Sequence, residues 1–115
     1  MAVTAQATGT QVAVISTEHQ LADIADAAVY TFHVDTVNMV SGDTLELRVY
    51  QMVLTAGIAR VAYFSRFYGA QAADDYIKIS VPIGNELTDA TSLRFSLKQT
   101  AGTGRTFVWK VLKYA

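Results

Sequence analysis

The sequence has no cysteine, one proline, few charged residues and no long hydrophobic run. Without cysteine the chain forms neither a disulfide framework nor a thiolate metal site, and it has no cysteine nucleophile. No segment approaches the roughly 18 apolar residues of a membrane span, and the first residues lack the basic start and apolar stretch of a signal or transit peptide. The sequence therefore predicts one soluble globular domain with no membrane partner.

Charged residues make up 17% of the chain and hydrophobic residues 51%, whereas globular domains average about 25% charged residues. A chain of this size leaves roughly a third of its unfolded surface exposed after folding, and there are few charged groups to cover it. We therefore expect some apolar side chains to face a partner, which favours an assembly protein. The alternative is a small domain with a full core and a surface of serine and threonine.

Acidic and basic residues are unevenly divided along the chain. Up to Gly57 there are six acidic residues and one arginine, whereas the remainder has eight basic and four acidic residues. If the two parts form different faces, the protomer is a dipole that could dock onto a neighbour. If the strands interleave in the fold, the charges mix and no dipole forms.

Alternating apolar and polar residues predict strands along most of the chain. The segment from Glu18 to Asp26 is the exception and is expected to be a helical turn or a loop, and Pro82 is expected to end a strand. An all-β fold follows, an antiparallel β-sandwich or jelly roll of about seven strands, with residues 11–115 as one domain and residues 1–10 as an extended N-terminal arm. The expected strands are 11–17, 28–35, 44–54, 58–68, 76–81, 92–100 and 105–114.

The strongest local signal lies near the C-terminus. The last two runs are separated by a short segment with Gly102 and Gly104, which can adopt positive φ angles. The sequence therefore predicts a β-hairpin from residue 92 to residue 114. In the returning strand Phe107, Trp109 and Val111 form one bulky row, which we expect to lie in the core.

Signals for catalysis and for cofactors are weak. The two histidines, His19 and His33, have no further ligand at metal-binding spacing. His33 and Asp35 could form part of a catalytic triad only with an activated serine, and the sequence has no such serine motif. The pair Asp74 and Asp75 lacks the regular oxygen spacing of a calcium loop. The glycine-rich segment before the last strand leads into a strand, not into the helix that a phosphate cradle needs. We expect no enzymatic activity and no cofactor or metal.

Nucleic-acid binding has some support, because basic residues stand among aromatic residues on the later strands, as they do in oligonucleotide-binding sheets. The isoelectric point near 6.0 argues against it. So does the even spread of the basic residues over three strands. We therefore expect no nucleic-acid partner.

Three segments, residues 42–47, 77–80 and 98–105, resemble small structural proteins that tailed-bacteriophage genomes encode near their capsid genes. The resemblance spans residues 41–115. It implies a decoration, or cement, protein on the outer capsid surface of the virion, which bridges neighbouring copies of the phage major capsid protein, often at a local three-fold or two-fold axis. It also implies a homo-oligomer, with a trimer favoured and a dimer possible.

Interface candidates lie on the less obviously buried sides of the strands, where tyrosine and arginine are frequent in interface hot spots. The N-terminal arm from Val3 to Gln11 is a separate candidate, because strand addition to a neighbour uses backbone hydrogen bonds. Deletion of residues 2–10 is then expected to abolish shell binding and to leave the melting temperature nearly unchanged. The candidates on the strands are Tyr50, Phe64, Arg66, Tyr68, Tyr76 and Tyr114.

Two alternatives stay open. A phage tail or neck component would have a similar fold but few copies in each particle. A fibre module that binds carbohydrate or a receptor would need a groove with a stacked tryptophan or tyrosine, and the single tryptophan, Trp109, is expected in the core.

Overall fold

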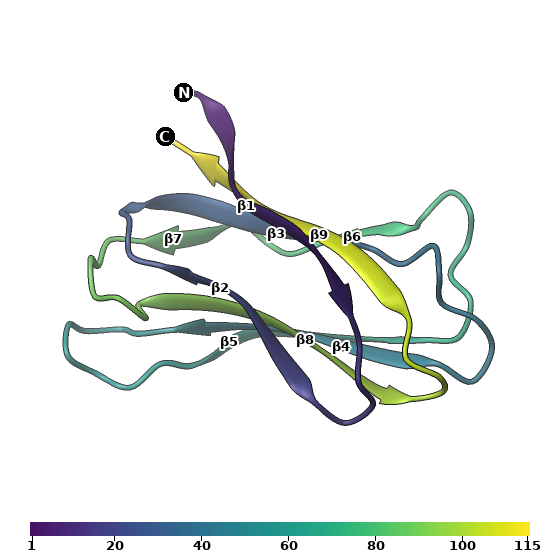
Figure 1. Cartoon of the computed structure of the whole chain (residues 1–115). Helices are drawn as coiled ribbons and strands as arrows, with labels where there is room; N and C mark the ends of the chain where they lie inside the picture. The colour runs from purple at the N-terminus through teal and green to yellow at the C-terminus, as the bar shows by residue number, and fades with distance from the viewer.

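Nine strands form two antiparallel sheets that stack face to face (Figure 1). The computed structural model describes residues 1–115, and none of its segments is a helix that could span a membrane. Sheet A has the order β1-β9-β3-β6, with β7 also paired to β3, and sheet B has the order β2-β8-β4-β5. The strands are β1 (Val3–Val12), β2 (Glu18–Ile24), β3 (Ala28–Asp35), β4 (Thr44–Gln51), β5 (Arg60–Tyr68), β6 (Ile77–Ile79), β7 (Ile83–Asn85), β8 (Leu93–Ala101) and β9 (Thr106–Tyr114).

Strands that follow one another in the chain mostly lie in opposite sheets. Only β4 and β5 are consecutive and paired, while β6 and β7, separated by the stretch that contains Pro82, both pair with β3. This strand order is that of a jelly roll. The predicted fold class is confirmed, with nine strands in place of the expected seven.

The expected N-terminal arm is not free. Residues 3–12 form β1, which pairs with β9 over its whole length, and the two ends of the chain are joined by hydrogen bonds between Ala2 and Ala115 of 2.7 and 3.0 Å. Gly9 packs against the indole of Trp109, where a Cβ atom would lie 2.9 Å from the ring. The first strand therefore begins earlier than residue 11 and ends at Val12, because β1 closes one side of the core.

The predicted helical turn or loop from Glu18 to Asp26 is also wrong. Residues 18–24 form β2, which pairs with β8. The register shifts between Gln20 and Ala22, so a bulge interrupts the alternation that would have indicated a strand. Ile24 is buried in the core and Leu21 packs against it.

The predicted C-terminal β-hairpin is wrong in its pairing. The turn exists, with Gly102 at φ +89°, but β8 lies in sheet B and β9 in sheet A, so the two strands face each other across the core (Figure 1). The buried Gln99 side chain supplies hydrogen-bond partners for the backbone of this turn. It donates to the carbonyls of Ala101 and Thr103 and accepts from the Arg105 amide. A side chain thus replaces the cross-strand hydrogen bonds that a hairpin would have.

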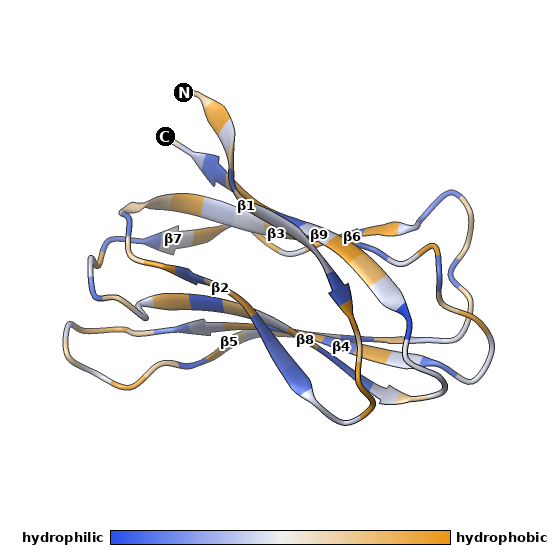
Figure 2. Ribbon diagram, viewed as in Figure 1, coloured by the Kyte–Doolittle hydropathy of each residue, from blue (hydrophilic) through white to orange (hydrophobic).

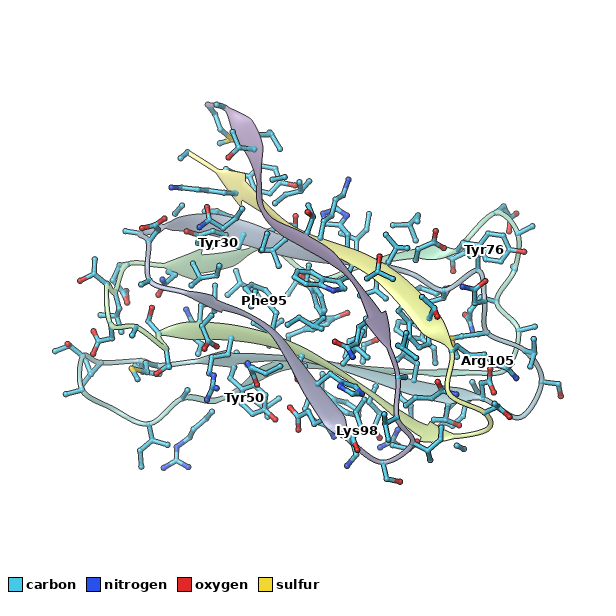
Figure 3. The ribbon with its side chains drawn as sticks, viewed as in Figure 1. Tyr30, Tyr50, Tyr76, Phe95, Lys98 and Arg105 are labelled. Carbon is cyan, nitrogen blue, oxygen red and sulfur yellow. The ribbon has the colours of Figure 1, made fainter.

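The core lies between the sheets and contains the rows that the alternation predicted. Phe32 of β3 meets Phe95 of β8 with ring centroids 5.4 Å apart, and Trp109 is buried as expected. Figure 3 shows Phe95 in the space between the two sheets. The fully buried side chains include Tyr30, Phe32, Phe95, Phe107, Leu45, Leu47, Leu93, Leu97, Val34, Val49 and Val111.

The charge division along the chain produces no dipole between halves, because strands from both parts interleave in each sheet. Acidic residues of the first part pair directly with basic residues of the second. Asp43 is the most deeply buried acidic residue among these pairs, and its carboxylate lies 2.9 Å from the Arg105 guanidinium. The other such pairs are Asp23 with Arg94, Asp26 with Lys113 and Glu46 with Arg66.

Candidate interaction surfaces

Four of the predicted interface residues gather on the outer face of sheet B. Tyr50 lies on β4, and Phe64, Arg66 and Tyr68 lie on the neighbouring β5, which forms one edge of the sheet. Figure 3 shows Tyr50 and Lys98 on this lower face, directed away from the core. The period-two alternation of β4 and β5 accounts for the grouping. It places these side chains on the outer face of the sheet, whereas Leu45, Leu47 and Val49 point to the core.

Glu46 is the centre of this face. Its buried carboxylate lies 2.8 Å from Arg48 and 2.8 Å from Arg66, and both guanidinium groups stack over the Phe64 ring at 4.9 and 5.1 Å from its centroid. Burial raises the pKa of Glu46, but the hydrogen bonds and charges of the two arginines outweigh it and hold the pKa below its ordinary value. The charge of Glu46 is therefore neutralised within the face, and the half-exposed Phe64 ring already contacts two cations.

A second polar group lies beside it. The Glu18 carboxylate of β2 accepts hydrogen bonds from the Tyr50 hydroxyl at 2.6 Å and from the Ser96 hydroxyl at 2.7 Å. Burial raises the pKa of Glu18, but these two hydrogen bonds and the charges of Arg48 and Lys98 together outweigh burial and lower the pKa. Burial and the bond to Glu18 both raise the pKa of Tyr50. Tyr50 is thus held in a fixed position by its own sheet.

The remaining predicted residues are dispersed. Val3 on β1 and Tyr114 on β9 are register partners on the outer face of sheet A, and the Tyr114 hydroxyl lies 3.0 Å from the Thr31 hydroxyl. Gln11 is half-buried on β1 and donates to the Val12 carbonyl. Tyr76 precedes β6 at one end of the sandwich (Figure 3), and its carbonyl accepts two hydrogen bonds from Thr36. The eight candidates therefore do not form one site.

The outer face of sheet A carries a set of exposed aliphatic side chains beside threonines such as Thr8 and Thr10, and the sequence analysis did not identify this set. Few charged side chains interrupt it, and in Figure 2 hydrophobic colour marks parts of β3, β6 and β9. The alternation of β6 groups Ile77, Ile79 and Val81 on one face but does not show that this face is the outer one, since it is Lys78 and Ser80 that point inward there. We call this surface the aliphatic face, and its exposed members are Val3, Val12, Val29, Ile77, Ile79, Val81 and Val108.

Two neighbouring cross-strand rows line a shallow hollow of about 500 Å³ on this face. His33 contacts the Thr31 hydroxyl at 2.8 Å and makes no bond to Asp35, whose carboxylate accepts from the Val37 amide. Burial and the Lys110 charge both lower the pKa of His33, which favours the neutral ring. The lining residues on these rows are Thr10, Val108, Asp35 and Ile77, and beside them Thr8, Lys110 and His33.

The loop between β4 and β5, residues 52–59, is a second aliphatic surface, here called the tip loop. Val53, Leu54 and Ile58 are 83%, 74% and 71% exposed. The Asp89 carboxylate holds the loop, because it accepts from the Thr55 hydroxyl and from the Ala56 amide, both at 2.8 Å. These bonds, the Ala56 amide first, lower the pKa of Asp89. Apolar residues in an otherwise turn-like segment are the signal that could have indicated this surface.

The three surfaces differ in composition, since one is charged and aromatic and two carry exposed aliphatic side chains. Nowhere in the chain do three or more histidine, aspartate or glutamate side chains gather in a way that could hold a metal ion. Comparisons with models of protein families, with curated proteins and with solved structures find no match for this chain.

Proposed function

We propose that this chain is a non-enzymatic structural protein of a tailed-phage particle, which binds the outer surface of the capsid and stabilises the shell by bridging major capsid proteins. The resemblance of residues 41–115 to phage structural proteins supports the proposal. The jelly-roll fold is compatible with it, since viral capsid proteins use this fold, although lectins also do. Binding to a shell requires an exposed contact, and the tip loop has exposed aliphatic residues.

The tip loop is the observation on which the proposal depends. A connecting loop that meets only water gains nothing from three large exposed aliphatic side chains. The bonds from Asp89 fix the loop backbone before any partner binds, so little conformational entropy is lost on docking. We assign the tip loop as the contact that inserts into an apolar depression of the shell.

The copy number of the chain in purified particles from its source tests the function. Quantitative mass spectrometry against the major capsid protein should give hundreds of copies in a simple ratio to the shell subunit. A handful of copies would place the chain in the neck or tail. Its absence from particles would overturn the proposal.

The variant Leu54→Asp tests the contact. A carboxylate in an apolar depression loses its hydration, so binding to shells that lack the chain should weaken by at least about a hundredfold. The control is Val14→Asp, which changes a similarly exposed aliphatic residue in the loop at the opposite end of the sandwich (Figure 1). Equal saturation of shells by both variants would show that the tip loop is not the contact.

A second candidate, a tail-fibre module that binds carbohydrate, is favoured by the aromatic and charged side chains on the outer face of sheet B. Tyr68 is exposed there, and Arg66 lies beside it. Sugars stack on such rings and accept hydrogen bonds from such donors. Glycan-array binding that is lost in Tyr68→Ala would favour this function over shell binding.

A further inference from the structure

The aliphatic face has an unusual strand at one edge. In β6 the side chains of Ile77 and Ile79 point to solvent, while Lys78 and Ser80 of the same segment are buried. The buried lysine is accommodated by Asp75 at 2.8 Å and by the Phe67 ring at 5.0 Å, and the Ser80 hydroxyl accepts from the Phe32 amide at 2.9 Å. In water this inversion is unfavourable, because it exposes apolar area and buries polar groups. A partner that covers the face would remove the exposed apolar area from water.

The charges on this face are one of each sign, and neither is paired within the chain. Asp35 is the register partner of Val108, and Lys110 follows two residues later on the same strand. No salt bridge within 4.0 Å joins Asp35 or Lys110 to any group of the protomer. A two-fold axis that runs between them in the plane of the contact brings Lys110 of each copy opposite Asp35 of the other. The face is thus complementary to itself in charge as well as apolar.

The face is also large enough for a stable pair. The molecule measures 41 × 29 × 19 Å along its principal axes, and Figure 1 shows the two stacked sheets edge-on. A standard protein interface covers about 800 Å² on each partner, which is close to the rectangle that the longest and the shortest dimensions enclose, so such a contact uses nearly the whole face. Sheets pack face to face about 10 Å apart with interdigitating aliphatic side chains, and Ile77, Ile79 and Val81 at alternate positions of the edge segment suit that packing.

We propose that the aliphatic face binds a second copy of this chain, sheet A against sheet A about a two-fold axis. The pair leaves both tip loops, which belong to sheet B, free for other contacts. The inference concerns the purified chain alone and does not depend on the proposed binding to a shell.

The first experiment measures the mass of the purified protein in solution by light scattering after size-exclusion chromatography. The wild-type chain should be a dimer at micromolar concentration. Val108→Asp places a charge in the contact and should weaken dimerisation by about a hundredfold or more. The matched control is Val61→Asp on the outer face of sheet B, since Val61 is 49% and Val108 54% exposed, and it should stay dimeric. Circular dichroism checks that both variants are folded.

Charge reversal then tests the two-fold arrangement. Lys110→Asp alone opposes aspartates across the axis, and Asp35→Lys alone opposes lysines, so each variant should be monomeric at concentrations where the wild type is a dimer. Mixed in equal amounts, they should form a heterodimer in native mass spectrometry, because both contacts then pair opposite charges. A wild-type chain that is a monomer up to about 1 mM, or a trimer, overturns the proposal. Homodimers of the two charge variants, or a mixture that forms no heterodimer, overturn the assignment of this face.

Discussion

At the scale of single residues, the best-defined interaction is the buried carboxylate of Glu46 between Arg48 and Arg66. Glu46→Gln keeps the shape of the side chain but removes its charge, so two guanidinium groups lose their counter-ion. We expect the free energy of unfolding to fall by about 2 kcal/mol, measured by urea denaturation. Glu86→Gln changes an exposed glutamate without an ion pair and should alter stability by less than about 0.5 kcal/mol. Equal effects would contradict the role of the Glu46 network.

The acidic groups also predict how stability depends on pH. The pKa values of Glu18 and Glu46 lie below their ordinary value of 4.5, and that of Asp43 lies below 3.8. Their contribution is present above those ordinary values and is lost as the pH falls through the lower pKa values of the folded state, because protons then bind preferentially to the unfolded chain. Thermal unfolding from pH 7 to pH 2 should show a steep loss of stability below about pH 4.5. The loss should be shallower in Glu46→Gln, and parallel curves would exclude Glu46 as a source.

Gly9 is needed for a close approach of backbone to ring. A Cβ atom at this position would lie 2.9 Å from the Trp109 indole, whereas a Cβ atom at Gly84 would meet nothing within 4 Å. Gly9→Ala should therefore destabilise the protein by about 1 to 3 kcal/mol. Gly84→Ala should leave stability unchanged or raise it by up to about 1 kcal/mol. Both are measured by urea denaturation, and a neutral Gly9→Ala would mean that β1 can move away from the indole.

At the scale of secondary-structure elements, β1 is the strand whose role differs most from the sequence expectation. Deletion of residues 2–10 removes most of the ladder with β9 and uncovers Trp109. We now expect the free energy of unfolding to fall by at least about 3 kcal/mol, with a clear drop in melting temperature by calorimetry. Removal of Met1 alone, which is exposed, is the control. An unchanged melting temperature after the long deletion would restore the free-arm interpretation.

Strands β3, β4, β8 and β9 could be predicted with nearly correct bounds and faces, since uninterrupted alternation is a local property. Strand β2 could not, because its bulge near Leu21 interrupts the period. Strand β7, only three residues long, follows Pro82 and is defined by its pairing with β3. Of the candidate surfaces, alternation placed Tyr50 and Arg66 on an outer face, but it did not indicate that Ile77 and Ile79 also point outward.

At the scale of the whole molecule, the two chain ends are neighbours in sheet A and hydrogen-bond to each other. A circular permutant that joins Ala115 to Met1 by a short glycine linker and opens the exposed loop between Ala73 and Asp74 keeps every strand intact. It should unfold cooperatively and lose no more than about 2 kcal/mol. Far-UV circular dichroism and urea denaturation check this expectation, and a chain without a cooperative transition would contradict the observed closure of the ends.

The sequence by itself determined the all-β class, the inward row of Phe107, Trp109 and Val111 and the turn at Gly102, because these follow from side-chain alternation and from local backbone freedom. The tertiary structure decided which strands are neighbours. Gly102 gives a turn in either case, but only the packing of Phe95 and Phe107 on opposite sides of the core places β8 and β9 in different sheets. Alternation states which residues share a face and not what covers that face, so the burial of Lys78 and the exposure of Ile77 depend on contacts with distant segments.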